Sequence, residues 1–280
     1  MTVVLACDLG SSGLRAGLVD SAGIVRAVHK VALAADAGGD ADGGDPAKWW
    51  EAFVACAGVL QAVEPGVFAR VGAIAIGGMT RTQVLLDAQA HAVRPALSWA
   101  DTRAGAMMDE IARRLPPSHP ETAQVNAYHP AARLAWLQRH EPDVFARIAA
   151  VVDPKDYLNA RLTGRIVSDA ISLARLDASR VEHDGQSILS ALGINARLVP
   201  PLMPPTSVMG HVQARLPVPI DRLAGVPVVT MAHDTWASVL GLGALREGFA
   251  YNLSGTTEVL GVLGRDVEPA EGLLRVDWSQ

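Results

Sequence analysis

The chain has 280 residues, of which 50% are hydrophobic and 19% charged, so it is long enough to bury a large core and too apolar for a disordered protein. Its net charge of −5 gives no basic footprint for nucleic acid, and no apolar stretch approaches the roughly 20 residues that cross a bilayer. No basic region precedes the short apolar run at the N-terminus, and Cys7 and Cys56 lie within apolar patterns, as buried thiols would. These features predict a soluble, cytoplasmic protein with no nucleic-acid or membrane partner.

A cluster of glycine and serine follows Asp8. The apolar runs 3–7 and 14–19 flank this cluster and predict two strands joined by a tight hairpin. The N–H groups of such a turn make an anion site, and Asp8 at the strand end is an oxygen ligand suited to Mg²⁺, so the stretch favours a nucleotide site. The candidate phosphate-binding residues are Gly10, Ser11, Ser12 and Arg15. An ordinary Gly-rich hairpin is the alternative at this point.

The next elements lead to a polar loop. In order, the patterns predict a strand, a loop and a helix over residues 24–33, 34–44 and 46–63. Asp45 is placed to cap that helix, which starts with Pro46. Residues 71–76 then predict a buried strand, and the polar residues that follow it are placed to line a ligand site. The candidates there are Thr80 and Arg81.

A second candidate loop follows a predicted strand at residues 93–97. It contains Trp99 and Asp101, and a helix is expected after it to about residue 115. Asp101 either lines the ligand site or simply caps this helix. Short helices are expected further on, over residues 131–139, 143–150 and 155–162, the last of them closed by Gly164.

Asp234 stands between a predicted buried strand at 228–231 and a helix that is expected to reach residue 245. The helix dipole favours a carboxylate at this position, although a plain N-cap has the same pattern. Residues 249–253 and 259–263 predict two more strands around a Gly/hydroxyl turn, which repeats the opening hairpin. The P-loop and Rossmann glycine patterns are absent.

Five short segments resemble motifs of the FGGY family of carbohydrate kinases, in the family's order and over nearly the whole chain. They are the turn at 8–15, W-x-D-x-R at 99–103, K-D-Y-L with L-T-G at 155–164, H-D at 233–234 with the glycines that follow, and G-T-T at 255–257. The resemblance implies an α/β fold of the actin-like (ribonuclease H-like) type. It also implies transfer of the γ-phosphate of ATP to a hydroxyl of a ketose or polyol.

The resemblance implies roles for the residues that match. Asp234 is expected to be the general base, Asp8 to help hold Mg²⁺, and Trp99 and Asp101 to shape the sugar side. A second phosphate turn is expected at Gly255, Thr256 and Thr257. These roles agree with the physics, because phosphoryl transfer needs positioning and charge neutralisation more than covalent chemistry.

The substrate loop departs from the family. Xylulokinase-like members tend to have Met-His where this chain has Met79 and Thr80, and glycerol-kinase-like members have Arg-Glu. Thr80 cannot make the contacts of a histidine, and the neighbouring Arg81 carries a permanent charge. The identity of the sugar is therefore open, and an acidic sugar is one of the alternatives.

The end of the chain also departs from the family, because Gln280 follows soon after the second turn and the family's adenosine-binding glycines are not present. We expect a first domain at residues 1–245 and the first strands of a second domain at 246–280. A homodimer, or a separately encoded C-terminal half, would be the protein partner. The alternative to a kinase is a catalytically incomplete sugar-binding or interaction module.

Overall fold

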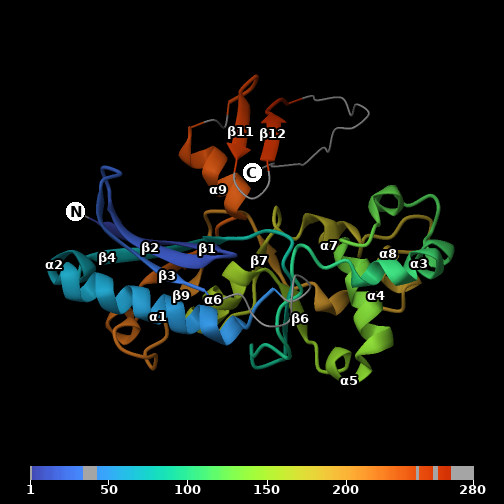
Figure 1. Ribbon diagram of the computed structural model, residues 1–280, viewed down its shortest axis with the longest axis horizontal. Helices are drawn as coiled ribbons and strands as arrows, with labels where there is room; N and C mark the ends of the chain where they lie inside the picture. Colours follow the sequence, from blue (N-terminus) through green and yellow to red (C-terminus); the bar gives the residue numbers. More distant parts are fainter. Residues whose placement is uncertain (1, 34–42, 244–245, 255–257, 266–280) are drawn as a thin grey trace.

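The computed structural model describes residues 2–33, 43–243, 246–254 and 258–265, and the fold is built around a six-stranded sheet (Figure 1). In spatial order the strands are β3 (Val25–Ala32), β2 (Gly13–Asp20), β1 (Val3–Gly10), β4 (Val71–Gly78), β10 (Pro227–Val229) and β9 (Val208–His211). The first three form an antiparallel meander, whereas β4 and β10 run parallel to β1. The carboxyl ends of β1, β4 and β10 therefore meet at one edge of the sheet, where ligands bind in open α/β sheets.

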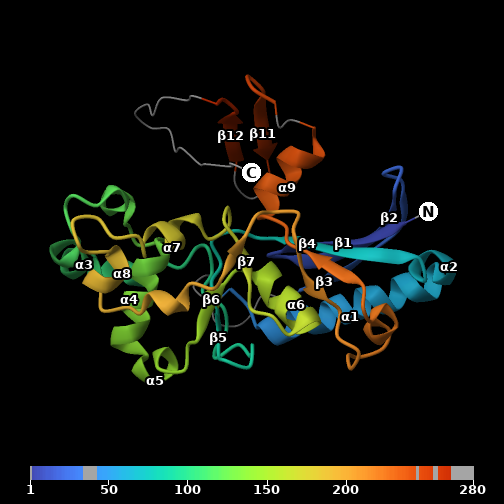
Figure 2. The same cartoon turned by 180° about the vertical axis from the view of Figure 1, so that it is seen from behind.

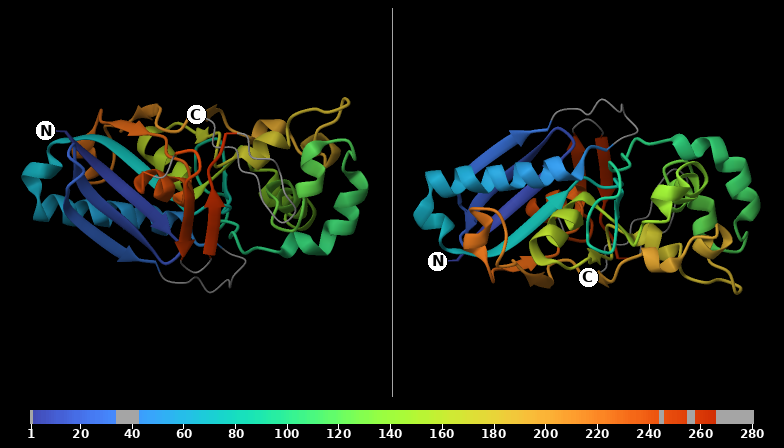
Figure 3. Two further views of the ribbon diagram at one scale, coloured as in Figure 1. Left: turned by 90° about the horizontal axis from the view of Figure 1, so that it is seen from above. Right: turned by 90° about the horizontal axis from the view of Figure 1, so that it is seen from below.

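Two helices cover one face of the sheet. Helix α1 (Pro46–Val63) is capped by Asp45, whose side chain accepts a main-chain N–H of the first turn at 2.9 Å, as the sequence predicts. Its apolar side buries Phe53 completely against the sheet. Helix α6 (Pro154–Thr163) lies beside α1 on the same face (Figure 3). It ends at Gly164 with φ 72°, which confirms the predicted cap.

A second, mostly helical core lies beside the sheet (Figure 2). Its α-helices are α3 (Met108–Arg114), α4 (Pro130–His140), α5 (Pro142–Phe145), α7 (Ala174–Ala178) and α8 (Ile188–Ala191). Shorter elements of the chain are α2 (Pro65–Phe68) and the 3₁₀ turns η1 (Arg103–Met107), η2 (Pro120–Gln124), η3 (Ala196–Leu198) and η4 (Ile220–Leu223). Two small ladders join the cores: β5 (Val84–Leu86) with β6 (Ala150–Val152), and β7 (Ser168–Asp169) with β8 (Leu202–Met203).

The remaining elements lie on the side of the sheet opposite α1 (Figure 1). Helix α9 (Asp234–Gly241) follows β10, and a separate hairpin is formed by β11 (Ala250–Ser254) and β12 (Glu258–Val262). Among the strands of the described residues, β11 and β12 pair only with each other. None of the helices in these residues combines the length and the apolar character that crossing a membrane requires.

Two predicted elements are wrong. Of residues 93–97, Leu97 alone forms a bridge, an isolated one with Gln83, since Pro95 has no N–H to donate to a ladder. The helix predicted over 143–150 ends at Phe145, because Ala150 instead joins β6 and pairs with β5.

The helix that starts at Asp234 is shorter than predicted. It ends at Gly241, and Gly243 takes φ 65°, in the left-handed region where a regular helix does not continue. Both cysteines are free and buried, which confirms the prediction. The predicted second phosphate turn, residues 255–257, lies outside the described residues, although the strands on either side of it form as predicted.

Candidate functional site

Two carboxylates lie near the edge where the parallel strands end. Asp8 is near the end of β1, in register with Arg15 on β2 and Gly77 on β4. Asp234 is the first residue of α9, in the connection that leaves β10. Helix α9 packs directly over the end of β4, since a Cβ added at Gly77 would lie 3.9 Å from the Cβ of Ala237. The fold therefore brings together two acids that are 226 positions apart in the numbering.

The pKa of each acid is raised, and the charge of Asp8 contributes to the shift at Asp234. Burial raises the pKa of Asp234, and the charge of Asp8 raises it further, against the hydrogen bonds that Thr235 donates from its N–H at 2.6 Å and its hydroxyl at 3.3 Å. Burial also raises the pKa of Asp8, although the charges of Arg15 and Lys30 oppose this effect. A carboxylate whose pKa is raised is the stronger proton acceptor, so Asp234 suits the work of a general base.

The turn between β1 and β2 has the predicted form, with Gly10 opposite Gly13 and the residues at its tip, Ser11 and Ser12, exposed. Neither glycine has a positive φ, so the turn does not use the left-handed conformation that glycine permits. Gly13 is required for space, because a Cβ there would lie 2.8 Å from the carbonyl oxygen of Val31.

A second cation accompanies Arg15, and the sequence reasoning missed it. Lys30 on β3 is in register with Arg15, and its Cε would lie 2.7 Å from a Cβ at Gly13. The row of Asp8, Arg15 and Lys30 crosses three strands beside the exposed hydroxyls of the turn. Two cations, turn hydroxyls and one accessible carboxylate form a donor set that fits a phosphate chain with a divalent cation. The register of the predicted meander was the signal that could have identified Lys30.

The substrate-side candidates lie together in two neighbouring loops. Arg81 has φ 58°, and its main-chain oxygen accepts a hydrogen bond from Arg133 of α4 at 2.7 Å. Arg133 also donates to the main-chain oxygens of Trp99 at 3.0 Å and Asp101 at 3.3 Å. Trp99 is 39% exposed, and Thr80 beside Arg81 is half-buried.

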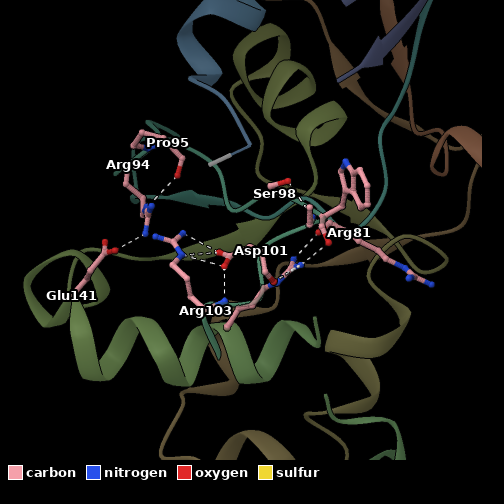
Figure 4. Close-up of polar contacts among 10 residues, drawn as sticks. Arg81, Arg94, Pro95, Ser98, Asp101, Arg103 and Glu141 are labelled. Carbon is pink, nitrogen blue, oxygen red and sulfur yellow. Dashed lines mark hydrogen bonds and ion pairs between the residues drawn. The ribbon is translucent and has the colours of Figure 1, made fainter. Parts of the chain in front are cut away.

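Asp101 points into the protein. It is 2% exposed, and its carboxylate accepts two-pronged hydrogen bonds from Arg103 at 2.9 and 3.1 Å (Figure 4). Its Oδ1 also accepts the N–H of Arg103 at the start of η1. Asp101 therefore shapes its loop from within, whereas the side chain of Trp99 in the same loop is accessible.

A buried ion cluster lies behind Asp234, and the sequence identified only part of it. Nζ of Lys155 lies 2.6 Å from Asp156 and 2.6 Å from Asp169, and all three side chains are at most 1% exposed. Burial lowers the pKa of His233 to about 4, and the charges of Lys155 and Arg81 lower it further, although Asp169 opposes them. Its Nδ1 accepts the N–H of Trp236 at 3.4 Å, so a neutral imidazole starts α9 beside Asp234. No spacing in the sequence connects Asp169 to the K-D-Y-L segment.

Comparison with known proteins identifies the family. Residues 3–241 match the model of the N-terminal domain of the FGGY family of carbohydrate kinases. The chain belongs to this family. The xylulose kinase of Escherichia coli K12 is 31% identical over 264 residues, which cover 91% of this chain and 53% of the relative. The xylulose kinase of Lactococcus lactis is 29% identical, over 98% of this chain and 56% of the relative.

The similarity to solved structures confirms the predicted α/β, actin-like fold of this FGGY-family chain. The crystal structure of the xylulose kinase from Rhodospirillum rubrum superimposes with a TM-score of 0.76 at 28% identity, over 89% of this chain and 53% of that one. The chain therefore spans about half the length of the relatives that it matches.

Proposed function

We propose that the protein transfers the γ-phosphate of ATP to a hydroxyl of a ketose or polyol, with Asp234 as the general base. The observation that carries this proposal is the position of Asp234. It starts a helix at the edge where the parallel strands end, within electrostatic reach of Asp8, in a chain of a carbohydrate-kinase family. Named relatives include xylulose kinases and L-fuculokinases, which supports a ketose as the acceptor.

On the phosphate side, Asp8 would hold Mg²⁺, and the hydroxyls and N–H groups of Ser11 and Ser12 would bind the phosphate together with Arg15. Mg²⁺ would neutralise charge on the phosphates when bound. Lys30 adds a second positive charge on the same face of the sheet. The turn at Gly255, Thr256 and Thr257 is proposed to contact the same phosphates from the second domain.

On the sugar side, Asp234 would accept the proton of the attacking hydroxyl. Trp99 presents an exposed indole, which suits stacking on the apolar face of a sugar, while Thr80 and Arg81 offer a hydroxyl and a cation. Asp101 would shape this side through its loop, since its carboxylate is bound to Arg103.

We also propose the domain division expected from the sequence, with residues 1–245 as the first domain and 246–280 as the start of the second. Its support is that β11 and β12 form their own sheet and that the family model for the N-terminal domain ends at residue 241.

The test is a phosphotransfer assay of the full-length protein on a panel of ketoses, polyols and sugar acids. Asp234→Asn should lower turnover by about 10²- to 10⁴-fold and leave sugar binding largely intact. Asp143→Asn, on the exposed surface of α5, is the matched control and should have wild-type turnover. Turnover of Asp234→Asn close to that of the control would remove Asp234 from the mechanism. Sugar binding without transfer by the wild type would favour the incomplete sugar-binding module.

A further inference from the structure

We propose that Arg133 is a positioning residue that holds the two substrate-side loops together and so sets the geometry of sugar binding. We call its contacts the carbonyl clamp, defined as the hydrogen bonds from the Arg133 guanidinium to the main-chain oxygens of Arg81, Trp99 and Asp101. The proposal rests on the proposed function for its link to sugar, whereas the clamp itself is tested separately below.

The clamp connects segments that come from different parts of the fold. Arg81 follows β4 of the large sheet, whereas Trp99 and Asp101 precede η1 of the helical core. Arg133 reaches both from α4, with Nη1 on one loop and Nη2 on the other. One rigid, planar group therefore fixes the separation of the two loops, which a flexible side chain with a single donor atom would not do.

The partners of this cation are unusual. Arg133 is 2% exposed, and every hydrogen bond that it makes among the described residues goes to a carbonyl oxygen. Burial lowers its pKa to about 10, and the charge of Asp101 opposes this shift. A buried cation without a bonded carboxylate is a poor source of stability, because its desolvation is only partly repaid. The burial of Arg133 is better explained by a role in positioning the two loops whose carbonyl oxygens it binds.

The clamp matters most for Arg81. The φ of 58° at this residue lies in the left-handed region, which is unfavourable for an L-residue with a Cβ. The charge-assisted hydrogen bond from Arg133 to the carbonyl oxygen of Arg81 supports that conformation, and the backbone conformation sets the direction of the Arg81 side chain. The charge of Arg81 reaches His233, next to the proposed base, so a change in this loop would alter the sugar side close to Asp234.

Helix α4 holds the Trp99 loop at a second point. Trp136, one turn after Arg133, lies under the guanidinium of Arg103 at 4.6 Å, and Arg103 binds the carboxylate of Asp101. This loop therefore keeps one attachment if Arg133 is changed. Loss of the clamp should release Trp99 and Arg81 relative to each other without unfolding the helical core.

The test uses Arg133→Lys, which keeps the charge and loses the fork, and Arg133→Met, which removes the charge. Arg147→Lys is the matched control, because Arg147 also donates from Nη2 to a carbonyl oxygen, that of Val93, at 2.9 Å but away from both loops. The protein is labelled with 5-fluorotryptophan, and the ¹⁹F resonance of Trp99 is assigned with Trp99→Phe. Sugar KM and kcat, and the melting temperature, are measured on the same full-length variants.

We expect the Trp99 resonance to shift or broaden in Arg133→Lys while the buried tryptophans keep theirs, and the sugar KM to rise about tenfold with a smaller change in kcat. Arg147→Lys should leave both readouts at wild type. A lower melting temperature for Arg133→Lys, with an unchanged Trp99 resonance and KM, would overturn the proposal and make Arg133 merely structural. If Arg133→Met does not fold, Arg133→Lys decides alone.

The proposed function can fail separately. If the wild type neither binds nor phosphorylates any sugar of the panel, the kinase assignment is refuted. The Trp99 resonance then decides the clamp, because a shift in Arg133→Lys supports it and an unchanged signal overturns it.

Discussion

Replacement of Lys155 by methionine should strongly destabilise the protein. Methionine has a similar length and no charge, so the change removes the cation that lies 2.6 Å from both Asp156 and Asp169. Asp156 keeps its hydrogen bond from the hydroxyl of Ser168 at 2.6 Å, and Asp169 keeps two main-chain N–H donors at 2.8 and 2.9 Å. Each carboxylate therefore loses only its contact with the lysine, and both stay buried.

The magnitude follows from this geometry. Removal of one partner from a buried ion pair costs about 3–5 kcal/mol. Here the lysine serves two carboxylates, but protonation of one of them limits the cost of leaving both without the lysine. We therefore expect the free energy of unfolding to fall by about 4 kcal/mol. At about 2–4 °C per kcal/mol for a chain of this size, the melting temperature should fall by about 8–16 °C.

The loss should also depend on pH. In the wild type, burial raises the pKa of Asp169, but the adjacent Lys155 outweighs this effect and holds the pKa below its usual value. A lowered folded-state pKa stabilises the protein above the unfolded pKa, and this contribution is lost as the pH falls through the folded pKa. Burial already raises the pKa of Asp156 in the wild type, with Lys155 opposing it, so in Lys155→Met burial should raise the pKa of both acids. Protonation of these acids then stabilises the variant relative to the wild type as the pH falls. The difference in the free energy of unfolding between the wild type and Lys155→Met should therefore be smaller at about pH 5.5 than at about pH 7.5.

Urea unfolding followed by circular dichroism at the two pH values measures this gap. Arg180→Met is the matched control, because its pair with Asp177 at 2.5 Å is half exposed and should contribute less than about 1 kcal/mol. A triple change of Lys155→Met with Asp156→Asn and Asp169→Asn should recover much of the loss, since the two carboxylates that contacted the lysine are then neutral amides. A loss below about 1 kcal/mol for Lys155→Met, or an equal loss at both pH values, would refute the reasoning.

Three further predictions concern the site. Asp8→Asn removes the like charge that raises the pKa of Asp234, so the acidic limb of the turnover–pH profile should move to lower pH. An acidic limb at the wild-type pH would show that the two acids do not interact. Arg81→Ala should raise the sugar KM about tenfold if the guanidinium contacts the sugar, and an unchanged substrate profile would take Arg81 off the sugar side. The melting temperature should change by less than about 2 °C, because the Arg81 guanidinium has no hydrogen-bond or ion-pair partner among the described residues. A polypeptide of the printed 280 residues should bind ATP–Mg²⁺ with a Kd in about the millimolar range, since a phosphate turn offers few apolar contacts, and micromolar affinity by calorimetry would contradict this.

Local patterns in the sequence determined much of this protein. The hairpin after Asp8, the cap at Asp45 and the cap at Gly164 depend on neighbouring residues, whose backbone preferences act over a few positions. The order of the family motifs is also readable in the sequence, and it indicates the family and the actin-like fold. The sequence also placed Asp234 between a buried strand and a helix, which is a position suited to a functional carboxylate.

The tertiary structure decided what depends on contacts between distant residues. Only the parallel order of β1, β4 and β10 brings Asp8 within electrostatic reach of Asp234. The contact of Lys155 with Asp169 and the contacts of Arg133 arise from packing between residues 14 to 52 positions apart. The inward direction of the Asp101 carboxylate arises from burial of its loop. Periodicity and turn chemistry describe one segment at a time, whereas burial and electrostatic coupling exist only once the segments have packed together.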